Sequence, residues 1–298
     1  MKNNPFVSII INNYNYGRFL GEAIDSALNQ TYCHSEVIVV DDGSTDDSNE
    51  IIESYRNKII SVIKENGGQA SAFNAGFAVS QGDIICFLDS DDIFLPKKVA
   101  EVVDVFKSQP EIGWCFHTLS FFDNDTGKII PKTNYSNLPH NCDFRRNTER
   151  GKLPFIPTAT SGICFRRSLL QLVLPMPEDI RITSDNYIKF TTLGLSKGCF
   201  MNKELVIQRV HGNNAYTLRK DKQQFQAKIL IVTAYWIRIK FPNLFRLANE
   251  ICVNSLVIYW NTNGLNSEAN DVVNKYFSSV TIWEKFKIKS KTIYRYLK

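Results

Sequence analysis

The chain has 298 residues, of which 44% are hydrophobic and 22% are charged. This composition excludes wholesale disorder, and the length suffices for one large domain or for a domain with an appendage. The net charge is +5, and residues 281–298, with six Lys and Arg against one Glu, carry all of that excess. Because the rest of the chain is neutral overall, we expect no nucleic-acid partner.

Neither the cysteines nor the apolar runs are typical of an exported or membrane-spanning protein. The seven cysteines include no CxxC pair, so reduced thiols are favoured over a disulfide framework. Residues 1–5 are polar, and the apolar run 6–11 is shorter than the core of a signal peptide. The longest later apolar run, 229–237, is too short to span a bilayer. We therefore expect a cytoplasmic protein.

The first 122 residues alternate between strand and helix patterns. Apolar, β-rich runs predict strands at residues 7–11, 36–40, 59–63, 83–88 and 113–122. Between them, apolar residues at helical spacing predict helices that end near residues 28, 55, 79 and 107. Ser44 or Thr45 is expected to cap the second of these helices. Strands that alternate with helices predict an α/β fold, with a mostly parallel sheet covered by helices on both faces.

In such a sheet, ligands bind beyond the carboxyl ends of the strands. Three polar segments are expected there, at residues 12–16, 41–45 and 89–92, and the last two are dense in carboxylates. Residues 123–157 are polar and contain four prolines, which predicts a long surface excursion. From about residue 216 onward the pattern becomes helical.

The acidic run Asp89-Ser90-Asp91-Asp92 directly follows the strand predicted at 83–88. The chain has no GxxxxGK[ST] loop and no GxGxxG after the first strand, so a bound diphosphate would need another source of positive charge. Alternation along an extended segment places Asp89 and Asp91 on one side, where they would repel each other unless a cation or a proton lies between them. Mg²⁺ or Mn²⁺ suits such oxygen ligands. An acidic turn that caps the following helix is the alternative interpretation.

The run Asp41-Asp42-Gly43-Ser44 also allows two interpretations. It can form a tight turn with a helix cap. However, Asp41 follows the buried run 37–40, where an unpaired carboxylate is costly. A bound base or ribose would give that carboxylate a partner.

Taken together, five motifs resemble the bacterial family 2 glycosyltransferases of the GT-A fold. Their order and spacing agree with that family from about residue 5 to residue 211, with weaker agreement between 123 and 157. The motifs are VSIII at 7–11 with NYN at 13–15, VVDDGS at 39–44, NGG at 66–68, NAG at 74–76 and LDSDD at 88–92.

The resemblance implies an inverting transfer from a nucleotide-diphosphate sugar to an acceptor hydroxyl, with Mn²⁺ or Mg²⁺ as cofactor. It implies that Asp91 ligates the metal and that Asp89 reaches the ribose or the metal. Tyr14 would lie near the base, Asp42 would bind the base and Asp41 would shape its turn. The full set of donor-binding residues that the resemblance implies is Asn12, Tyr14, Asp41, Asp42, Asn66, Gly67, Gly68, Gln69, Asp89 and Ser90.

Two later positions complete the implied site. Asp185, preceded by Ser184 where the family usually has Glu, would be the catalytic base; a simple helix cap is the alternative. His211, in the segment RVHGN at 209–213, would lie near the diphosphate and the metal as a ligand; a solvated loop histidine is the alternative. The segment 160–162 resembles the acceptor side of the family's site.

The resemblance also implies a division into a GT-A catalytic domain, residues 1–215, and a helical C-terminal region, residues 216–298. Within the former, residues 1–122 would form the nucleotide-sugar half and 123–215 the acceptor half. A UDP-sugar is the favoured donor, and a glycan or lipid-linked molecule the acceptor, in bacterial surface polysaccharide or lipopolysaccharide assembly. Two alternatives are a non-catalytic nucleotide-sugar-binding scaffold and a sugar nucleotidyltransferase, which would need a glycine-rich basic loop after the first strand.

The basic tail, residues 281–298, has a pattern of its own. At helical spacing Trp283, Phe286, Ile293 and Leu297 fall near one face, with lysines around it. This pattern is typical of a helix that lies on an anionic membrane surface, on the inner face of the cell membrane here. A helix packed on the protein's own body is the alternative.

Overall fold

The computed structural model describes residues 4–130, 140–212, 221–262 and 267–298, and the chain divides into two compact units. Unit 1 comprises Met1–Asp143, Ile156–Arg181 and Leu195–Gly212. Unit 2 comprises Phe144–Phe155, Ile182–Gly194 and Asn213–Lys298. The helical C-terminal region therefore belongs to the same unit as two segments from the first 215 residues.

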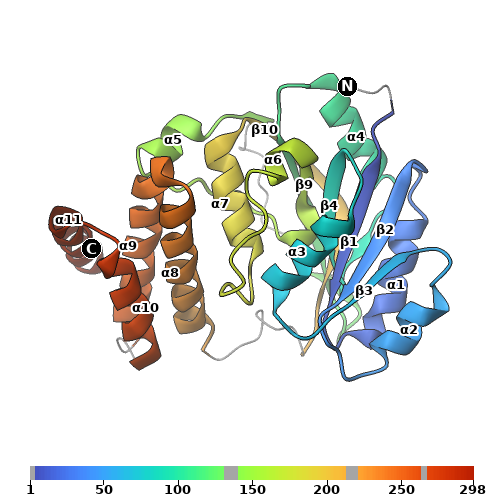
Figure 1. Ribbon diagram of the computed structural model, residues 1–298, viewed down its shortest axis with the longest axis horizontal. Coiled ribbons are helices and arrows are strands. Elements are labelled where there is room, and N and C mark those ends of the chain that lie inside the picture. Colours follow the sequence, from blue (N-terminus) through green and yellow to red (C-terminus); the bar gives the residue numbers. More distant parts are fainter. Residues whose placement is uncertain (1–3, 131–139, 213–220, 263–266) are drawn as a thin grey trace. The chain divides into compact units, whose positions relative to one another are not determined.

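Unit 1 is built on one mixed sheet (Figure 1). Its strands are β1 (Val7–Asn13), β2 (Ser35–Asp41), β3 (Ile60–Ile63), β4 (Ile84–Asp89), β5 (Ile93–Phe94), β6 (Trp114–Asp123), β7 (Lys128–Ile130), β8 (Asn141–Cys142), β9 (Ile163–Arg166) and β10 (Gly198–Val210). Parallel strands in the order β3-β2-β1-β4 form one half. The other half continues β9-β6-β10-β5; β9 runs antiparallel to both neighbours, whereas β6 and β10 pair in parallel.

The central strands are buried because their sequences are continuous apolar runs, as in a sheet that is covered on both faces. Ile9 and Ile10 of β1 point to opposite faces, and both are fully buried. One face, with Ile9, packs against α1 (Gly17–Leu28) and α4 (Lys98–Ser108). The other face, with Ile10, is covered by α3 (Gln69–Val79). The approach there is close, because a Cβ atom on Gly76 of α3 would lie 2.5 Å from Cγ2 of Ile10.

One local prediction for this unit is wrong. The helix after β2, α2, spans Ser48–Ser54, and its cap position is Asp47 rather than Ser44 or Thr45. Ser44 does not act as the cap, because its hydroxyl oxygen already accepts hydrogen bonds from the N–H of Asn15 at 2.8 Å and from Asn13 Nδ2 at 3.2 Å. Turn formation thus takes precedence over helix capping at this residue.

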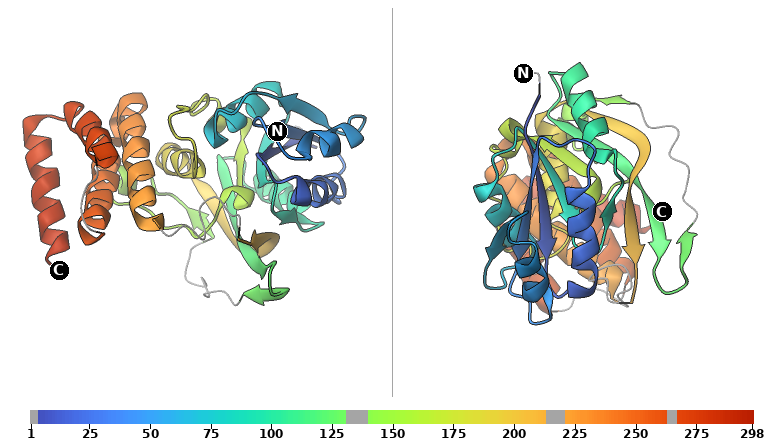
Figure 2. Two further views of the ribbon diagram at one scale, coloured as in Figure 1. Left: turned by 90° about the horizontal axis from the view of Figure 1, so that it is seen from below. Right: turned by 90° about the vertical axis from the view of Figure 1, so that its right-hand side faces the viewer.

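Unit 2 is helical. It contains α5 (Arg145–Glu149), α7 (Asp185–Leu195), α8 (Lys222–Lys240), α9 (Phe245–Asn261), α10 (Ser267–Ser278) and α11 (Ile282–Tyr296). The last residue of α7, Leu195, is assigned to unit 1. Helix α9 packs against α8, α5 and α11, and α10 packs against α8. In Figure 2 (left) the C-terminal helix α11, in dark red, stands at one side of this unit beside the other late helices.

Two sequence-based expectations fall partly outside the described residues. The polar excursion at 123–157 includes residues 131–139, and its described parts hold β7, β8 and α5. The onset of the helical region near 216 also lies outside the described residues, and the first helix described there is α8. Among the helices of the described ranges, none combines the length and the apolar character needed to cross a bilayer.

Candidate functional site

The three polar segments meet at one edge of the sheet, as the rule on the carboxyl ends of strands predicts. Asn12 at the end of β1 pairs in register with Asp89 of β4, and Asn13 pairs with Asp41 of β2. Asn12 Nδ2 donates a hydrogen bond to Asp89 Oδ1 at 2.9 Å, and Asn13 Nδ2 donates to Asp41 Oδ1 at 2.8 Å. β1 thus supplies the amide donors that hold both acidic strand ends.

Asp41 closes the turn after β2. It is fully buried and accepts hydrogen bonds from the backbone N–H of Ser44 at 2.9 Å and from the Ser44 hydroxyl at 2.6 Å. The Ser44 hydroxyl oxygen also accepts from the N–H of Asn15, a residue in the left-handed region with φ 56°. These bonds compensate for the burial of the carboxylate and tie the turn after β1 to the turn after β2.

The carboxylate of Asp42 holds the loop that precedes α3. It accepts hydrogen bonds from the N–H groups of Gly67 at 2.9 Å and Gly68 at 2.6 Å, and from Lys64 Nζ at 2.7 Å. The backbone carbonyl of Asp42 accepts a further bond from Asn66 Nδ2 at 2.9 Å. This carboxylate therefore organises the NGG segment in addition to any contact it makes with a ligand.

Gly68 allows this loop to enter α3. Its φ of +89° disfavours any side chain, and a Cβ atom there would lie 2.8 Å from the backbone of Arg181. The next residue, Gln69, donates through its N–H to the Arg181 carbonyl at 2.8 Å. The Gln69 side chain then reaches Asp89 Oδ1, with Nε2 at 3.3 Å. The loop is thereby joined to the acidic end of β4.

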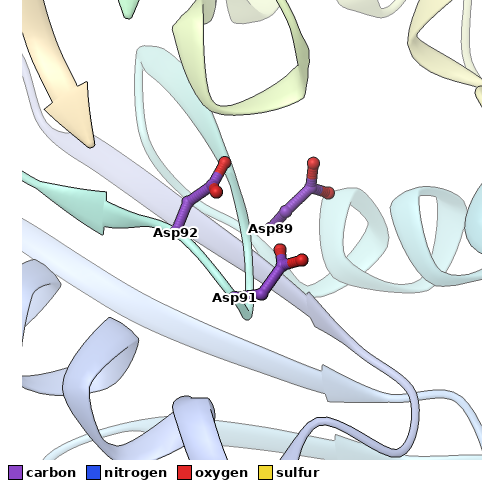
Figure 3. Close-up of side chains that lie close together, drawn as sticks. All are labelled: Asp89, Asp91 and Asp92. Carbon is purple, nitrogen blue, oxygen red and sulfur yellow. The ribbon is translucent and has the colours of Figure 1, made fainter. Parts of the chain in front are cut away.

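Three carboxylates lie together in the turn after β4. One oxygen of each of Asp89, Asp91 and Asp92 lies within 4.8 Å of the others, and the three groups face the same side of the turn (Figure 3). Among the described residues this is the set of acidic, His and Cys side chains that could hold a metal ion. The sequence predicts Asp89 and Asp91 as a pair, and the structure brings both into this cluster.

Asp92 is the most buried of the three, at 1% exposure, and it was not among the predicted ligands. Its Oδ2 accepts from the Ser161 hydroxyl at 2.6 Å and its Oδ1 from the Arg209 N–H at 3.1 Å. Burial raises the pKa of Asp92 well above its usual range, and the charges of Asp91 and Asp89 raise it further. A divalent cation beside the cluster would relieve this repulsion, so the donor set fits a metal.

His211 is buried against the cluster rather than solvated in a loop. It is 1% exposed, and its ring packs on Phe19, with ring centroids 4.6 Å apart. Arg18 Nη2, which can only donate, lies 3.2 Å from His211 Nδ1, and Asp91 Oδ2 lies 3.1 Å from Nε2. Nδ1 must therefore accept, and Nε2–H donates to Asp91.

Two other predicted residues differ in exposure. Tyr14 is 48% exposed at the end of β1, whereas Ser90 is buried. Within the described part of the chain, the Ser90 hydroxyl and Asn12 Oδ1 are buried polar atoms without a hydrogen-bond partner. Such atoms are uncommon, and they are typical of a place where a ligand or water binds.

Asp185 belongs to unit 2, where it is the first residue of α7. Thr183, two residues earlier, has φ of 51°, a strained conformation for a β-branched residue. The Asp185 carboxylate pairs with Lys189 Nζ, one helical turn later, at 2.8 Å, and both side chains are 12% exposed. The helix N-terminus stabilises a negative charge at this position.

The chain belongs to glycosyltransferase family 2. The family model described as glycosyl transferase family 2 matches residues 8–172, which confirms the resemblance seen in the motifs. An uncharacterised glycosyltransferase of Nostoc sp. is 36% identical over 213 residues, 70% of this chain and 66% of that protein. One of Rickettsia prowazekii is 32% identical over 215 residues, 70% of this chain and 64% of that protein. The chain thus spans a little under two thirds of the length of these relatives.

Solved structures confirm the predicted α/β fold of the GT-A type. S. aureus TarS, residues 1–349, in complex with UDP-GlcNAc has a TM-score of 0.65 at 16% identity, over 98% of this chain and 89% of that one. The mannosyltransferase PcManGT of Pyrobaculum calidifontis, in complex with GDP-Man and Mn²⁺, has a TM-score of 0.57 at 17% identity, over 98% and 86% of the two chains. At these identities the likeness concerns the fold.

Proposed function

We propose that this protein is an inverting, metal-dependent glycosyltransferase that moves a sugar from a nucleotide-diphosphate donor to an acceptor hydroxyl. The observation that carries the proposal is the cluster of Asp89, Asp91 and Asp92 at the carboxyl end of β4, in a chain of glycosyltransferase family 2. In a sheet of this type ligands bind at that edge. A scaffold that only binds a nucleotide sugar is the second candidate, and the experiments below separate the two.

Mn²⁺ or Mg²⁺ would be held by Asp91 and Asp89, while Asp92 anchors the turn through Ser161 and Arg209. When bound, the cation neutralises negative charge on the leaving diphosphate. We assign His211 the task of orienting Asp91 through its Nε2–H, because its Nδ1 lone pair already accepts from Arg18. This arrangement favours a positioning role over direct ligation by His211.

The donor would lie along the edge formed by β1, β2 and the loop before α3. TarS is described with UDP-GlcNAc, and the chondroitin synthase of Pasteurella multocida is 32% identical over 225 residues, 74% of this chain and 22% of that protein. PcManGT is described with GDP-Man, so the fold accommodates more than one base. We favour a UDP-sugar. The proposed donor-binding residues are Asn12, Tyr14, Asp41, Asp42, Asn66, Gly68, Gln69, Asp89 and Ser90.

Asp185 is the proposed catalytic base. Its carboxylate would take the proton of the acceptor hydroxyl as that oxygen forms a bond to the anomeric carbon and the bond to the nucleoside diphosphate breaks. One displacement of this kind inverts the anomeric configuration. The acceptor we propose is a glycan or a lipid-linked glycan in bacterial surface polysaccharide assembly, on the cytoplasmic side of a membrane.

The donor site is tested by calorimetric titration with UDP-, GDP-, dTDP- and CMP-sugars, with and without Mn²⁺. We expect one nucleotide class to bind, to need the metal, and to lose affinity in Asp91→Asn. Asp125→Asn, an exposed carboxylate in the turn between β6 and β7, is the matched control and should bind normally. Absence of binding by every donor in the presence of Mn²⁺ would contradict the proposal.

The base is tested separately with Asp185→Asn. We expect donor affinity to stay close to wild type and turnover to fall at least about 100-fold. Wild-type turnover in this variant would make the assignment of the base wrong while leaving the donor site intact. If the wild type binds the donor but shows no turnover with any acceptor tried, a scaffold that only binds a nucleotide sugar is favoured.

A further inference from the structure

Helix α11 is attached to the rest of unit 2 through a polar face. Arg238 of α8 donates from Nη1 and Nη2 to the two carboxylate oxygens of Glu284, at 3.0 and 2.9 Å. Glu284 also completes a capping box with Thr281, which begins the helix. Burial alone would raise the pKa of Glu284, but the hydrogen bonds from Arg238 and Thr281, with one from Asn249, outweigh it and lower this pKa to about 2.

Further along, the same face makes a second set of ionic contacts with α9. Lys291 Nζ and Arg295 Nη2 each lie 2.6 Å from one of the carboxylate oxygens of Glu250. Ile288 and Thr292, on the same face, are the buried residues of α11. The inward face of this helix is therefore mainly charged, the reverse of an ordinary surface helix.

The opposite face of α11 is apolar and exposed. Ile282, Trp283, Phe286, Ile293 and Leu297 are exposed by 81%, 74%, 66%, 48% and 76% respectively. We call these five residues the outer face of α11. Intervals of four and seven residues place most of them along a single stripe of the helix. Helix α11 does pack on the protein's own body, through α9, but it does so with its other face, so this apolar stripe stays exposed.

Lysines flank the outer face on both sides. Lys287 and Lys298 follow one edge and Lys289 the other, and all three are exposed. Lys289 Nζ lies 5.8 Å from the centroid of the Phe277 ring, and Lys298 Nζ lies 4.7 Å from that of the Tyr294 ring. Their charges are thus not neutralised by a carboxylate of the described residues.

We propose that the outer face of α11 binds the surface of an anionic lipid bilayer, with the helix axis in the membrane plane. An exposed apolar stripe that is bounded by lysines matches a layer of acyl chains beneath anionic headgroups. Trp283 suits the boundary between the two. The polar inward face explains how the helix stays attached to α9 while its apolar residues remain free. This proposal goes beyond sugar transfer and does not depend on it.

The whole 298-residue chain is tested by cosedimentation with vesicles of phosphatidylcholine alone or mixed with phosphatidylglycerol. We expect binding to the mixed vesicles, and a loss of about 100-fold in partitioning for the combined Trp283→Ser, Phe286→Ser and Leu297→Ser variant. Because these side chains are exposed, the variant should fold normally. The matched control, Ile129→Ser with Leu172→Ser, removes two exposed apolar side chains of unit 1 and should bind as wild type does.

The lysines are tested in the same assay. Replacement of Lys287, Lys289 and Lys298 by Gln should weaken binding to the mixed vesicles about fivefold per lysine. Equal binding of the wild type and the triple Ser variant would overturn the proposal, as would failure of the wild type to bind either vesicle. A wild-type dimer that the triple Ser variant abolishes, without vesicle binding, would also overturn it and would assign the outer face to a second copy of the chain.

Discussion

The carboxylate of Asp42 offers a sharp test of how the donor site is built. In the structure Gly67 N–H and Lys64 Nζ donate to Oδ1, while Gly68 N–H donates to Oδ2. In Asp42→Asn the carbonyl oxygen can replace only one carboxylate oxygen. If it takes the place of Oδ1, the side-chain amide faces the N–H of Gly68, donor against donor.

The expected loss of unfolding free energy in Asp42→Asn follows from these three hydrogen bonds. A hydrogen bond to a charged group contributes about 1.5 to 3 kcal/mol. Loss of the bond at Oδ2, and weakening of the two that remain, should lower the free energy of unfolding by about 2 to 4 kcal/mol. For a domain of this size the melting temperature should fall by about 5 to 10 °C. The assay is thermal unfolding followed by circular dichroism, with Asp125→Asn as the control.

The same variant separates two roles for Asp42. If the carboxylate organises the loop, stability and donor affinity fall together. If Asp42→Asn unfolds at the wild-type temperature but loses donor affinity, the carboxylate does not organise the loop before α3. It then acts through direct contact with the nucleotide.

Three further predictions concern packing, the acidic cluster and pH. Gly76→Ala should lower the free energy of unfolding by about 1 to 3 kcal/mol in urea titrations, because the new methyl group would meet Ile10 at 2.5 Å. Gly21→Ala, where the nearest atom is 3.8 Å away, should be neutral or stabilising. Ser161→Ala removes a hydrogen bond to the acidic cluster and should weaken Mn²⁺ affinity about 10- to 100-fold in calorimetry; unchanged affinity would count against the cluster as the metal site. Because the pKa of Glu284 is lowered to about 2, its ionic contacts should stabilise the protein fully above pH ~4.5 and progressively less as the pH falls toward 2. The stabilities of the wild type and Glu284→Gln should accordingly converge near pH 2, and a constant difference down to that pH would contradict the assignment.

The parallel half of the fold could be predicted from the sequence because its signals are local. The strand predicted at 7–11 is β1 (Val7–Asn13), that at 83–88 is β4 (Ile84–Asp89), and the helix predicted to end near residue 79 is α3 (Gln69–Val79). Each is an unbroken apolar run or a helical pattern bounded by turn residues. Asp89 and Asp91 could likewise be predicted to face the same side, since this follows from the geometry of one short segment.

What could not be predicted depends on contacts distant in sequence. β9 lies antiparallel between β4 and β6, an order that follows from pairing across the sheet rather than from the residues of β9 itself. Asp92 is held by Ser161 and Arg209, which lie 69 and 117 positions away. The acidic run carried a local signal for Asp92, whereas nothing in the sequence connects it with those two donors.

The orientation of α11 also depends on contacts that are distant in sequence. The helical pattern of residues 281–298 predicts α11 and an apolar face, but it does not determine which face of the helix packs on the protein. The choice is made by Arg238 and Glu250, which lie on α8 and α9 and attract the charged side of the helix. Periodicity therefore identifies the face, and tertiary ion pairs determine which way it turns.

Consumption of the donor is the direct test of whether the chain catalyses the metal-dependent glycosyl transfer proposed above. The measurement is release of free nucleotide from the donor that binds in the titrations, with and without Mn²⁺, in the presence of saccharide acceptors. We expect release that requires the metal, persists in Asp125→Asn and is lost in both Asp91→Asn and Asp185→Asn. If the wild type binds the donor with Mn²⁺ but leaves it intact under every condition, the protein is not a glycosyltransferase that acts on this donor.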